Sequence, residues 1–388
     1  MEKIVIASAS MTKFTDHYDK DIRHLASEVI ASTTLPLNLS PKDIDALVIG
    51  SMASQLFTRQ GNLGALIAQE NYMYNASAFT VEAGEASGQA AVRAAYSLIK
   101  SGMHDYALVV GVEKVTDVLK LPKLQSIVGY VNMDSRYEVD MGLTLASMYA
   151  MMAKAHMKKF GTKREQIASV AVKNHFHGSL NPLAQYRNKL SVEKVLSSEI
   201  VASPLTLFDT CAAADGAAAL LITTESKAKE LTDEYVEIKA STLAHSPVRL
   251  ADRENLYSIP SIKLAAEKAY EMANVTPDKI DVVEVHDSYT ITEIIALEEL
   301  GLFKRGEAGK ATEEKQTYFN SSIPVNTSGG MKARGYPFGA AGVAQLVELY
   351  LQLLSKAGDR QVKDAELGLA QAVAGTGGTS VVHILSTV

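Results

Sequence analysis

Cysteine is almost absent from this sequence, because Cys211 is the only one among 388 residues. A single cysteine excludes an intramolecular disulfide and a cysteine-rich metal site. Long apolar runs are missing too, since no stretch approaches the roughly 20 apolar residues of a membrane-spanning helix. The first residues, 1–14, hold only a short apolar run without the cleavage site of a signal peptide. We therefore expect a cytoplasmic protein with no membrane partner and no metal site.

An excess of positive charge is also missing. The formal net charge is −6, whereas nucleic-acid-binding proteins usually carry a basic face, so nucleic acid is not an expected partner. The composition, with 47% hydrophobic and 21% charged residues, is ordinary for a soluble globular protein. The length allows two or three domain-sized units, or one large α/β body with an insertion.

Short strand-like runs alternate with helix-like runs along the chain. This alternation is typical of an α/β fold, in which helices cover a mostly parallel or mixed sheet. Several runs are apolar and β-branched on both faces, which indicates buried central strands. The predicted strands are Ile4–Ala9, Ala46–Ser51, Tyr106–Gly111, Ala217–Thr223, Val236–Thr242, Val282–Val285, Leu367–Ala372 and Ser380–Leu385.

Two pairs of segments recur in the same order. Ser40–Ser51 and Thr276–Asp287 each combine a capping residue, a proline, charged residues and a strand beginning after Ile-Asp. Proline directly after Ser or Thr predicts a helix start. Gly88–Lys100 and Gly339–Lys356 are both small-residue-rich helices that lead to a strand. The repeated order favours a duplicated α/β unit.

A segment of different composition separates the two halves. It is rich in Met, Tyr, Lys and His, and it contains an amphipathic helix, Leu143–Phe160, and a polar stretch, Asn174–Lys189. We interpret it as an inserted helical subdomain. The predicted division is residues 1–115 plus 202–235 for the first half, 116–201 for the insertion, and 236–388 for the second half.

Glu85 lies in the motif VEAGEASG, residues 81–88, before an alanine-rich helix. A strand-to-helix turn places a side chain beside the unpaired N–H groups of the helix, which suits a reactive group or an anion. A solvated glutamate favoured by the helix dipole is the plainer interpretation. His286 lies in VHDSYT, residues 285–290, at the end of a predicted strand, where ligands bind in open α/β sheets. This histidine can polarise a carbonyl or move a proton, or it can simply bond within a turn.

Two glycine-rich stretches complete the candidate motifs. Residues 326–342, NTSGGMKARGYPFGAAG, have the glycine density of backbone that passes close to another group. They contain neither a Walker pattern nor a dinucleotide fingerprint, so a tight active-site loop is the preferred interpretation. Residues 374–380, AGTGGTS, can direct backbone amides at a carbonyl oxygen or form only a tight turn. Cys211 is expected to be inert, as most free buried cysteines are.

These motifs, in this order, resemble the thiolase superfamily along essentially the whole chain, most of all its sterol-carrier-type and archaeal acetyl-CoA acetyltransferase branch. The stretches that carry the resemblance are GVEKVTD, NPLAQYR, DGAAALLI, EVHDSYTITEIIALEELGL, PVNTSGGMKARGYPFGAAGVAQ and GLAQAVAGTGGTSVVHIL. The resemblance implies a duplicated five-layer α/β/α/β/α fold with an inserted loop domain. It agrees with the repeat and the insertion described above.

The resemblance also implies which positions carry chemistry, and here the sequence departs from the family. Glu85 stands where the family usually has its nucleophilic cysteine, and Tyr336 stands where the histidine of the Gly-His-Pro motif activates that cysteine. The stretch 374–378 lacks the second cysteine found in many thiolases. His286, with Tyr289 three residues on, matches the histidine that helps form the oxyanion hole for the thioester enolate.

The family further implies how substrates and partners are held. We expect Gly335, Gly339, Gly377 and Ser328 to help bind the coenzyme A thioester, and the loop segment 174–187 to contact coenzyme A. No permanently bound cofactor is expected, because the coenzyme A thioester is a substrate. The expected assembly is a homodimer or homotetramer, with an OB-fold/zinc-ribbon protein as a possible partner.

Three functions follow from this departure. A carboxylate at Glu85 is a poor acyl carrier, so one function is carbon–carbon bond chemistry on acyl-CoA through a stabilised enolate, such as retro-aldol cleavage, using Glu85, His286 and Tyr336. Cysteine-free thiolase relatives that act as aldolases have this character. The second is a catalytically silent subunit that binds acyl-CoA or a partner. The third is a true acyltransferase with a displaced nucleophile such as Cys211.

Overall fold

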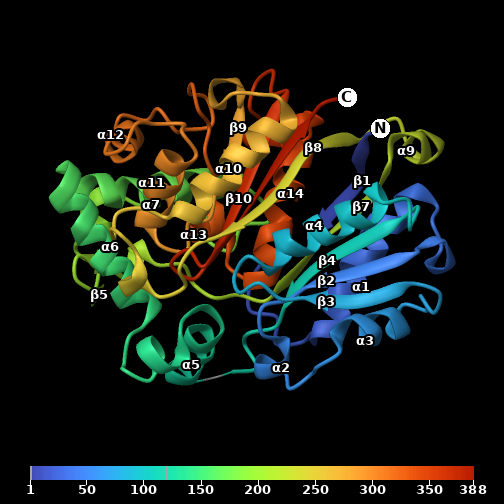
Figure 1. The fold of residues 1–388 in the computed structure, drawn as a ribbon, viewed down its shortest axis with the longest axis horizontal. Helices are drawn as coiled ribbons and strands as arrows, with labels where there is room; N and C mark the ends of the chain where they lie inside the picture. The colour runs from blue at the N-terminus through green and yellow to red at the C-terminus, as the bar shows by residue number, and fades with distance from the viewer. Residues whose placement is uncertain (1, 119) are drawn as a thin grey trace.

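A computed structural model of the chain describes residues 2–118 and 120–388. Its main feature is a nine-stranded sheet in the order β3-β2-β4-β7-β1-β8-β11-β10-β9 (Figure 1). The strands are β1 (Ile4–Met11), β2 (Ala46–Gly50), β3 (Ser77–Val81), β4 (Ala107–Glu113), β7 (Gly216–Thr224), β8 (Val236–His245), β9 (Val282–Glu284), β10 (Leu367–Ala374) and β11 (Thr379–Ser386).

The strand order repeats in mirror image about the middle of the sheet. In the first half, β2 pairs parallel to β4, and β4 and β1 pair antiparallel to β7. In the second half, β9 pairs parallel to β10, and β10 and β8 pair antiparallel to β11. The halves meet where β1 and β8 share two register pairs, Val5 with Glu237 and Ile6 with Val236. The duplicated α/β unit expected from the repeats is thus visible in the topology.

Two helices lie between the halves and form the central layer. They are α4 (Ser87–Lys100) and α14 (Phe338–Leu353), which contact each other and strands of both halves. A Cβ atom added at Gly88 would stand 2.1 Å from the carbonyl oxygen of Gly339, so only glycine allows this close crossing. The small residues that the sequence places at these helix starts therefore set the distance between the two halves.

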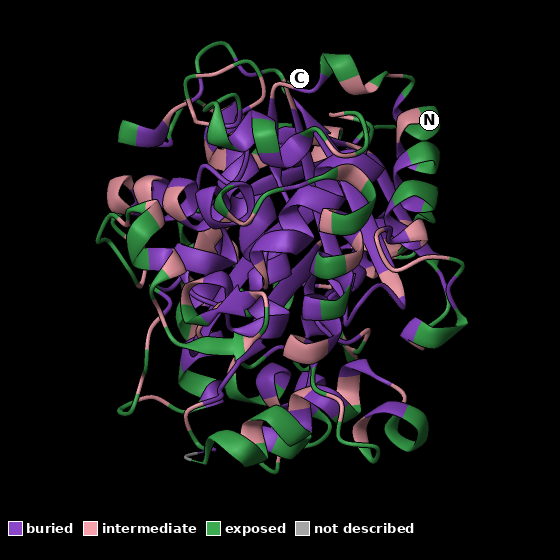
Figure 2. Ribbon diagram, turned by 90° about the vertical axis from the view of Figure 1, so that its left-hand side faces the viewer, coloured by how far each residue is buried: buried purple, intermediate pink, exposed green. Residues whose placement is uncertain are grey.

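The outer faces of the sheet carry further helices. On the first half these are α1 (Ile22–Thr34) and α3 (Leu63–Glu70), and on the second half α10 (Pro260–Ala273). Helix α11 (Thr290–Glu299) packs against α10, α6 (Leu145–Phe160), α7 (Arg164–Leu180) and α12 (Ala308–Glu313). Buried residues fill the interior of the molecule, shown in purple in Figure 2, and exposed residues lie mainly at its periphery. Short helices complete the body: α2 (Ser54–Phe57), α9 (Glu225–Leu231), α12 (Ala308–Glu313) and α13 (Gly330–Arg334).

The segment between β4 and β7 is mainly helical. It contains α5 (Leu121–Asn132), α6 (Leu145–Phe160), α7 (Arg164–Leu180), α8 (Val192–Leu196) and a two-stranded ribbon of β5 (Ile200–Ala202) and β6 (Leu205–Thr206). The amphipathic helix predicted at Leu143–Phe160 is confirmed as α6. That residues 116–201 form a separate unit stays a prediction.

Two local expectations were wrong. Asn174 is not in a loop but in α7, fully buried, where its amide donates to the carboxylates of Asp287 and Glu293 at 2.7 and 2.9 Å. The helix starts expected at Ser40 and Thr276 are single 3₁₀ turns, Pro41–Asp43 and Pro277–Lys279, because the chain enters a strand directly after each.

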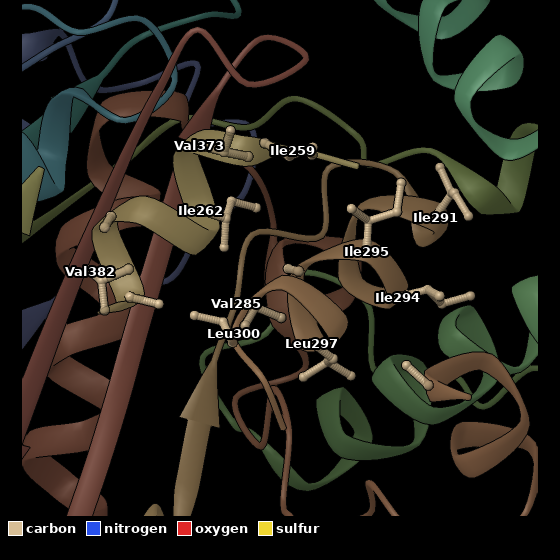
Figure 3. Packing of buried hydrophobic residues seen from close by; sticks show 14 of the residues in the cluster. Ile259, Ile262, Val285, Ile291, Ile294, Ile295, Leu297, Leu300, Val373 and Val382 are labelled. Atoms are coloured by element: carbon tan, nitrogen blue, oxygen red, sulfur yellow. The ribbon is translucent and has the colours of Figure 1, made fainter. Parts of the chain in front are cut away.

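The end of β9 is held in a large apolar cluster. Val285, just after the strand, lies among side chains from α10 and α11 and from the β10–β11 pair, several of which Figure 3 labels. This packing fixes the direction in which the following residues, His286 to Tyr289, leave the sheet. Within the described ranges, no helix combines the length and the apolar character needed to cross a membrane.

Candidate active site

Glu85 lies in the turn that joins β3 to α4, two residues before the helix begins. Its side chain is 1% exposed, and its backbone N–H donates to the side-chain oxygen of Asn132 at 3.0 Å. Gly84, at φ +57°, lets the backbone pass Asn132, since an added Cβ would stand 2.5 Å from the Asn132 oxygen. The glutamate is therefore a fixed, buried group and not a solvated helix-end charge.

Tyr336 reaches Glu85 from the other half of the molecule. It follows Gly335 in the turn between α13 and α14, and its hydroxyl donates to Oε1 of Glu85 at 2.7 Å. The Tyr336 hydroxyl oxygen also lies 3.4 Å from Nε2 of His286, and the two rings are nearly perpendicular, at 89°. The structure thus brings together three of the side chains that the sequence selected.

His286 is fully buried directly beyond β9. Its backbone N–H donates to the side-chain oxygen of Gln371 at 3.2 Å. Burial lowers the pKa of His286 to about 3, so the imidazole is neutral at physiological pH. Within the described part of the chain, Nδ1 of this ring has no hydrogen-bond partner.

Burial controls the proton affinity of the other two groups. The pKa of Glu85 is raised to about 7 by burial, against the opposing effect of the hydrogen bonds from Tyr336 and from the backbone N–H of Gly375. Burial and the charge of Glu85 raise the pKa of Tyr336 well above its usual range. The tyrosine is therefore a proton donor, whereas Glu85 exists in both protonation states near neutrality.

Two more tyrosines border this cluster. Tyr289, predicted from the motif, stacks on Tyr149 with ring centroids 4.5 Å apart. Tyr149 comes from α6, is fully buried, and donates its hydroxyl hydrogen to the carbonyl of Gly375. The N–H of Gly375 in turn donates to Oε2 of Glu85 at 3.0 Å. Tyr149 thereby fixes the loop that holds the glutamate.

Sequence reasoning missed Tyr149, Asn132 and Gln371. Each lies in an ordinary helix or strand, at a position whose pattern predicts only burial. For Tyr149, the one available signal is a phenol on the apolar face of a helix, where a buried hydroxyl needs a partner. For Asn132 and Gln371, no local sequence pattern predicts the hydrogen bonds that they accept from the backbone N–H groups of Glu85 and His286.

The four residues predicted to bind the thioester have other contacts in the structure. Ser328 donates its hydroxyl hydrogen to Glu284 at 2.6 Å. Gly339 lies in the α4–α14 crossing, and its N–H donates to Glu113 at 3.2 Å. The carbonyl of Gly377 accepts hydrogen bonds from two serines, and Gly335 allows the positive φ of +109° that precedes Tyr336. All four are buried, and the contacts described here are with other protein groups. Their contribution to thioester binding therefore stays a prediction.

Cys211 lies beside the cluster but is poorly suited as a nucleophile. Its thiol donates to the backbone oxygen of Asp287 at 3.1 Å. Burial, and then the charge of Asp287, raise its pKa well above the usual range, so the reactive thiolate is scarce. Across the described residues, no group of three His, Cys, Asp or Glu side chains is arranged to hold a metal ion.

Comparison with known proteins agrees with this architecture. The profile of the "Thiolase, N-terminal domain" family matches residues 4–226, and that of the "Thiolase C-terminal domain-like" family matches residues 242–387. The chain belongs to the thiolase family. This thiolase is 41% identical over 387 residues to the "Acetyl-CoA acetyltransferase" of Methanothermobacter thermautotrophicus, covering 100% of both chains.

A more distant sequence relative and a solved structure are also similar to this chain. It is 29% identical to "Sterol carrier protein 2" of Bos taurus, covering 98% of this chain and 72% of the bovine protein. The solved structure of an "Ltp2-ChsH2(DUF35) aldolase" superposes with a TM-score of 0.85 at 22% identity, covering 98% of this chain and 97% of that one. The predicted family and fold are confirmed, and the relatives support chemistry on CoA thioesters.

Proposed function

We propose that this thiolase makes or breaks a carbon–carbon bond next to a CoA thioester, without an acyl-enzyme, as in retro-aldol cleavage of a β-hydroxyacyl-CoA. The observation that carries the proposal is the hydrogen-bonded group of Glu85, Tyr336 and His286. A carboxylate, a phenol and a neutral imidazole provide a base, a proton donor and an oxyanion ligand. They provide no good acyl carrier.

The absence of an acyl-enzyme step follows from the residue types at two positions. The motif around Glu85 resembles the family's nucleophile motif, which usually carries cysteine. An acylated glutamate would be a mixed anhydride, which is poorly suited to reversible storage of an acyl group. Tyr336 replaces the histidine that would activate a thiol, so both the nucleophile and its base have changed together.

In the cleavage direction, we propose that the ionised Glu85 accepts the β-hydroxyl proton, directly or through Tyr336. The bond between Cα and Cβ then breaks, and Cβ becomes the carbonyl carbon of the released aldehyde or ketone. The electron pair of the bond passes through Cα to the thioester oxygen and forms an enolate. Return of the proton from Glu85 to Cα yields the shortened acyl-CoA, so no further reactant is consumed.

His286 is the proposed ligand of the enolate oxygen. Tyr336 directs its hydroxyl hydrogen to Glu85, so its oxygen faces His286 as an acceptor, at the long distance of 3.4 Å. This arrangement favours hydrogen on Nε2. A thioester oxygen that replaces this weak contact would receive the same N–H from a neutral ring, without reorganisation of the site.

The ionisation of Glu85 suits this task. A general base is most effective when its pKa lies near the working pH, and burial raises the pKa of Glu85 to about 7. A solvated glutamate would be a base weaker by more than two pKa units. Burial thus converts an ordinary carboxylate into a base of useful strength.

The comparisons support parts of this proposal. The structural neighbour is named as an aldolase that contains a DUF35 component, so the fold is compatible with aldol chemistry, although at 22% identity only the fold is shared. By the same analogy, we propose an OB-fold/zinc-ribbon protein as partner, and a homodimer or homotetramer as the assembly. The alternative function, acetyl transfer, is favoured by the 41% identity to an acetyl-CoA acetyltransferase.

The proposal is tested with the purified chain and a panel of β-hydroxyacyl-CoAs that differ in the group on Cβ. Release of an aldehyde or ketone together with the shortened acyl-CoA, abolished in Glu85→Gln, is the expected result. The matched control is Glu138→Gln, a buried glutamate that lies outside this group of three residues. Acetoacetyl-CoA formed from acetyl-CoA, with no carbonyl release from any substrate, would instead establish the acetyltransferase alternative.

A further inference from the structure

A cavity that the proposed reaction does not explain lies beside the active-site cluster. It has a volume of about 220 Å³ and is lined by His175, Tyr186, Leu207, Phe208, Thr210, Cys211, Ala212 and Lys332. Pockets for larger organic ligands hold roughly 300–1,000 Å³, so this one suits a small molecule or fragment. Cys211 forms the shared wall, since its N–H donates to the carbonyl of Ser288, two residues after His286.

The cavity contains a buried ammonium group without an acidic partner. Lys332 is 4% exposed, and its amino group donates to the backbone carbonyl of Thr210. Within residues 2–118 and 120–388, no carboxylate lies within 4.0 Å of this nitrogen. An ammonium has three hydrogens to donate, so two are left for a ligand.

The nearest acidic groups are already occupied. Asp287 accepts the backbone N–H groups of Met331 and Lys332 at 2.7 and 3.2 Å, and the amide of Asn174 as well. Asp209 accepts hydrogen bonds from Arg164 and several hydroxyl and backbone groups. Among the described residues, no acidic side chain lines the cavity, so Lys332 is the one charged group in its lining. Burial lowers the pKa of this amino group, and the nearby charges of Cys211, Asp287 and Asp209 oppose that effect.

A histidine supplies the second half of the recognition pattern. His175 is 4% exposed, and its Nδ1 hydrogen goes to the backbone carbonyl of Asn188 at 3.0 Å. A carbonyl can only accept, so Nδ1 carries the hydrogen and Nε2 of the neutral ring is an acceptor. Among the described residues this Nε2 atom is buried and has no hydrogen-bond partner. A buried acceptor of this kind requires a donor from elsewhere.

We propose that this cavity binds a short hydroxycarboxylate, with its carboxylate on Lys332 and its hydroxyl hydrogen on Nε2 of His175. A carboxylate provides the acceptor that the ammonium lacks, and charge-assisted hydrogen bonds of this kind are about twice as strong as neutral ones. The hydroxyl group provides the donor that the imidazole lacks. Phe208 and Tyr186, which pack beside the His175 ring, would cover the carbon chain of the ligand.

The test measures binding to the free protein by calorimetric titration, without any thioester, so its outcome is independent of the proposed reaction. The probes are 2-hydroxybutanoate, butanoate, 2-hydroxybutanamide and inorganic phosphate. We expect 2-hydroxybutanoate to bind at least tenfold more tightly than butanoate, which lacks the hydroxyl group, and than 2-hydroxybutanamide, which lacks the charge. Equal affinity for all three organic probes, or tighter binding of phosphate, would overturn the assignment.

Two variants assign each preference to its residue. Lys332→Met should abolish the preference for the acid over the amide. His175→Asn, which can still donate to the carbonyl of Asn188, should abolish only the preference for the hydroxyl group. Lys189→Met is the matched control, because Lys189 is exposed and does not line the cavity. If Lys332→Met does not fold, the His175→Asn result decides, since retention of the full hydroxyl preference there would overturn the proposal.

Discussion

Tyr336 donates a hydrogen bond of 2.7 Å to Glu85, although the two residues lie 251 positions apart in the chain. Each belongs to a different half of the duplicated fold, at the start of one of the two central helices. The proposed chemistry therefore depends on the close crossing of α4 and α14. Any change that moves this crossing should affect the bond between base and proton donor.

Tyr336→Phe should lower the cleavage rate by about 100-fold or more, in the range typical of a lost general acid or base. The Tyr336 bond lowers the pKa of Glu85, so its loss should also move the rising limb of the pH–rate profile to higher pH. Stopped-time assays across the pH range measure both effects. Tyr270→Phe, a partly buried tyrosine bonded to the carbonyl of Leu300, is the control, and an unchanged profile in Tyr336→Phe would contradict the proposed role.

Glu85→Gln should remove activity but stabilise the fold above neutral pH. The folded pKa of Glu85 is about 7 and the reference value is 4.5, so the folded protein resists ionisation that the unfolded chain undergoes. Below about pH 4 the carboxyl is protonated in both states, so it does not lower the free energy of unfolding. As the pH rises from 4.5 through about 7, the natural protein loses stability. Above that range the variant should be more stable by on the order of 3 kcal/mol.

Urea unfolding at two pH values measures this difference. The stability gain of Glu85→Gln over the natural sequence should be small below about pH 4 and fully developed above about pH 8. Glutamine can keep both contacts, since its oxygen can accept from Gly375 and its amide can donate to the Tyr336 oxygen. A gain that is the same at both pH values would show that the carboxyl of Glu85 is not raised in pKa.

Much of the fold was predictable because buried strands have a strong sequence signal. All eight predicted strands are present, with ends that differ by a few residues. Three strands of the described residues were missed. Strand β3 lies at the sheet edge and is mostly exposed, so its residues lack the apolar pattern, and β5 and β6 hold only three and two residues. The 3₁₀ turns at Pro41 and Pro277 share the capping signal of an α-helix, and only the following strand distinguishes them.

The site was predictable only in part. Glu85 and Tyr336 lie in glycine-containing motifs, whereas His286 and Tyr289 lie in the motif that ends a predicted strand. The structure brings Glu85, Tyr336 and His286 together, and Tyr289 borders them, stacked on Tyr149. Tyr149 was not found, because its contact with Gly375 joins positions that are 226 residues apart through tertiary packing alone. The raised pKa of Glu85 could not be predicted from the sequence either. The helix dipole lowers the pKa of a carboxyl group and burial raises it, and only the structure shows that burial has the larger effect here.

His286→Ala should lower the rate by about 100- to 1,000-fold, as removal of one oxyanion donor does in other enzymes. His286→Asn, which can still offer an N–H group, should lower the rate by less than His286→Ala does. The pKa of His286 is about 3 because the ring is buried, so the natural enzyme should show no inflection from this residue between about pH 5 and 9. A pH profile that loses an inflection near neutrality in His286→Asn would contradict a neutral imidazole.

Incubation with acetyl-CoA should leave the mass of the intact protein unchanged. Glu85 is a poor acyl carrier, and the Cys211 thiol is kept protonated by burial and by Asp287. Cys211→Ser should accordingly retain carbonyl release within about twofold, because the hydroxyl can still donate to the Asp287 carbonyl. A stable increase by one acetyl group that disappears in Cys211→Ser would establish acyl transfer through a displaced nucleophile.

Tyr149→Phe should reveal a positioning residue that acts through the backbone. The variant loses the hydrogen bond to the Gly375 carbonyl but keeps the ring that stacks on Tyr289. Gly375 then holds Glu85 less firmly, and because its N–H lowers the pKa of Glu85, the rising limb of the pH–rate profile should move to higher pH. The maximal rate should fall by about tenfold, less than in Tyr336→Phe, since the variant leaves the base and its proton donor in place. If Tyr149→Phe lowered the rate equally at every pH, the bond would serve stability alone.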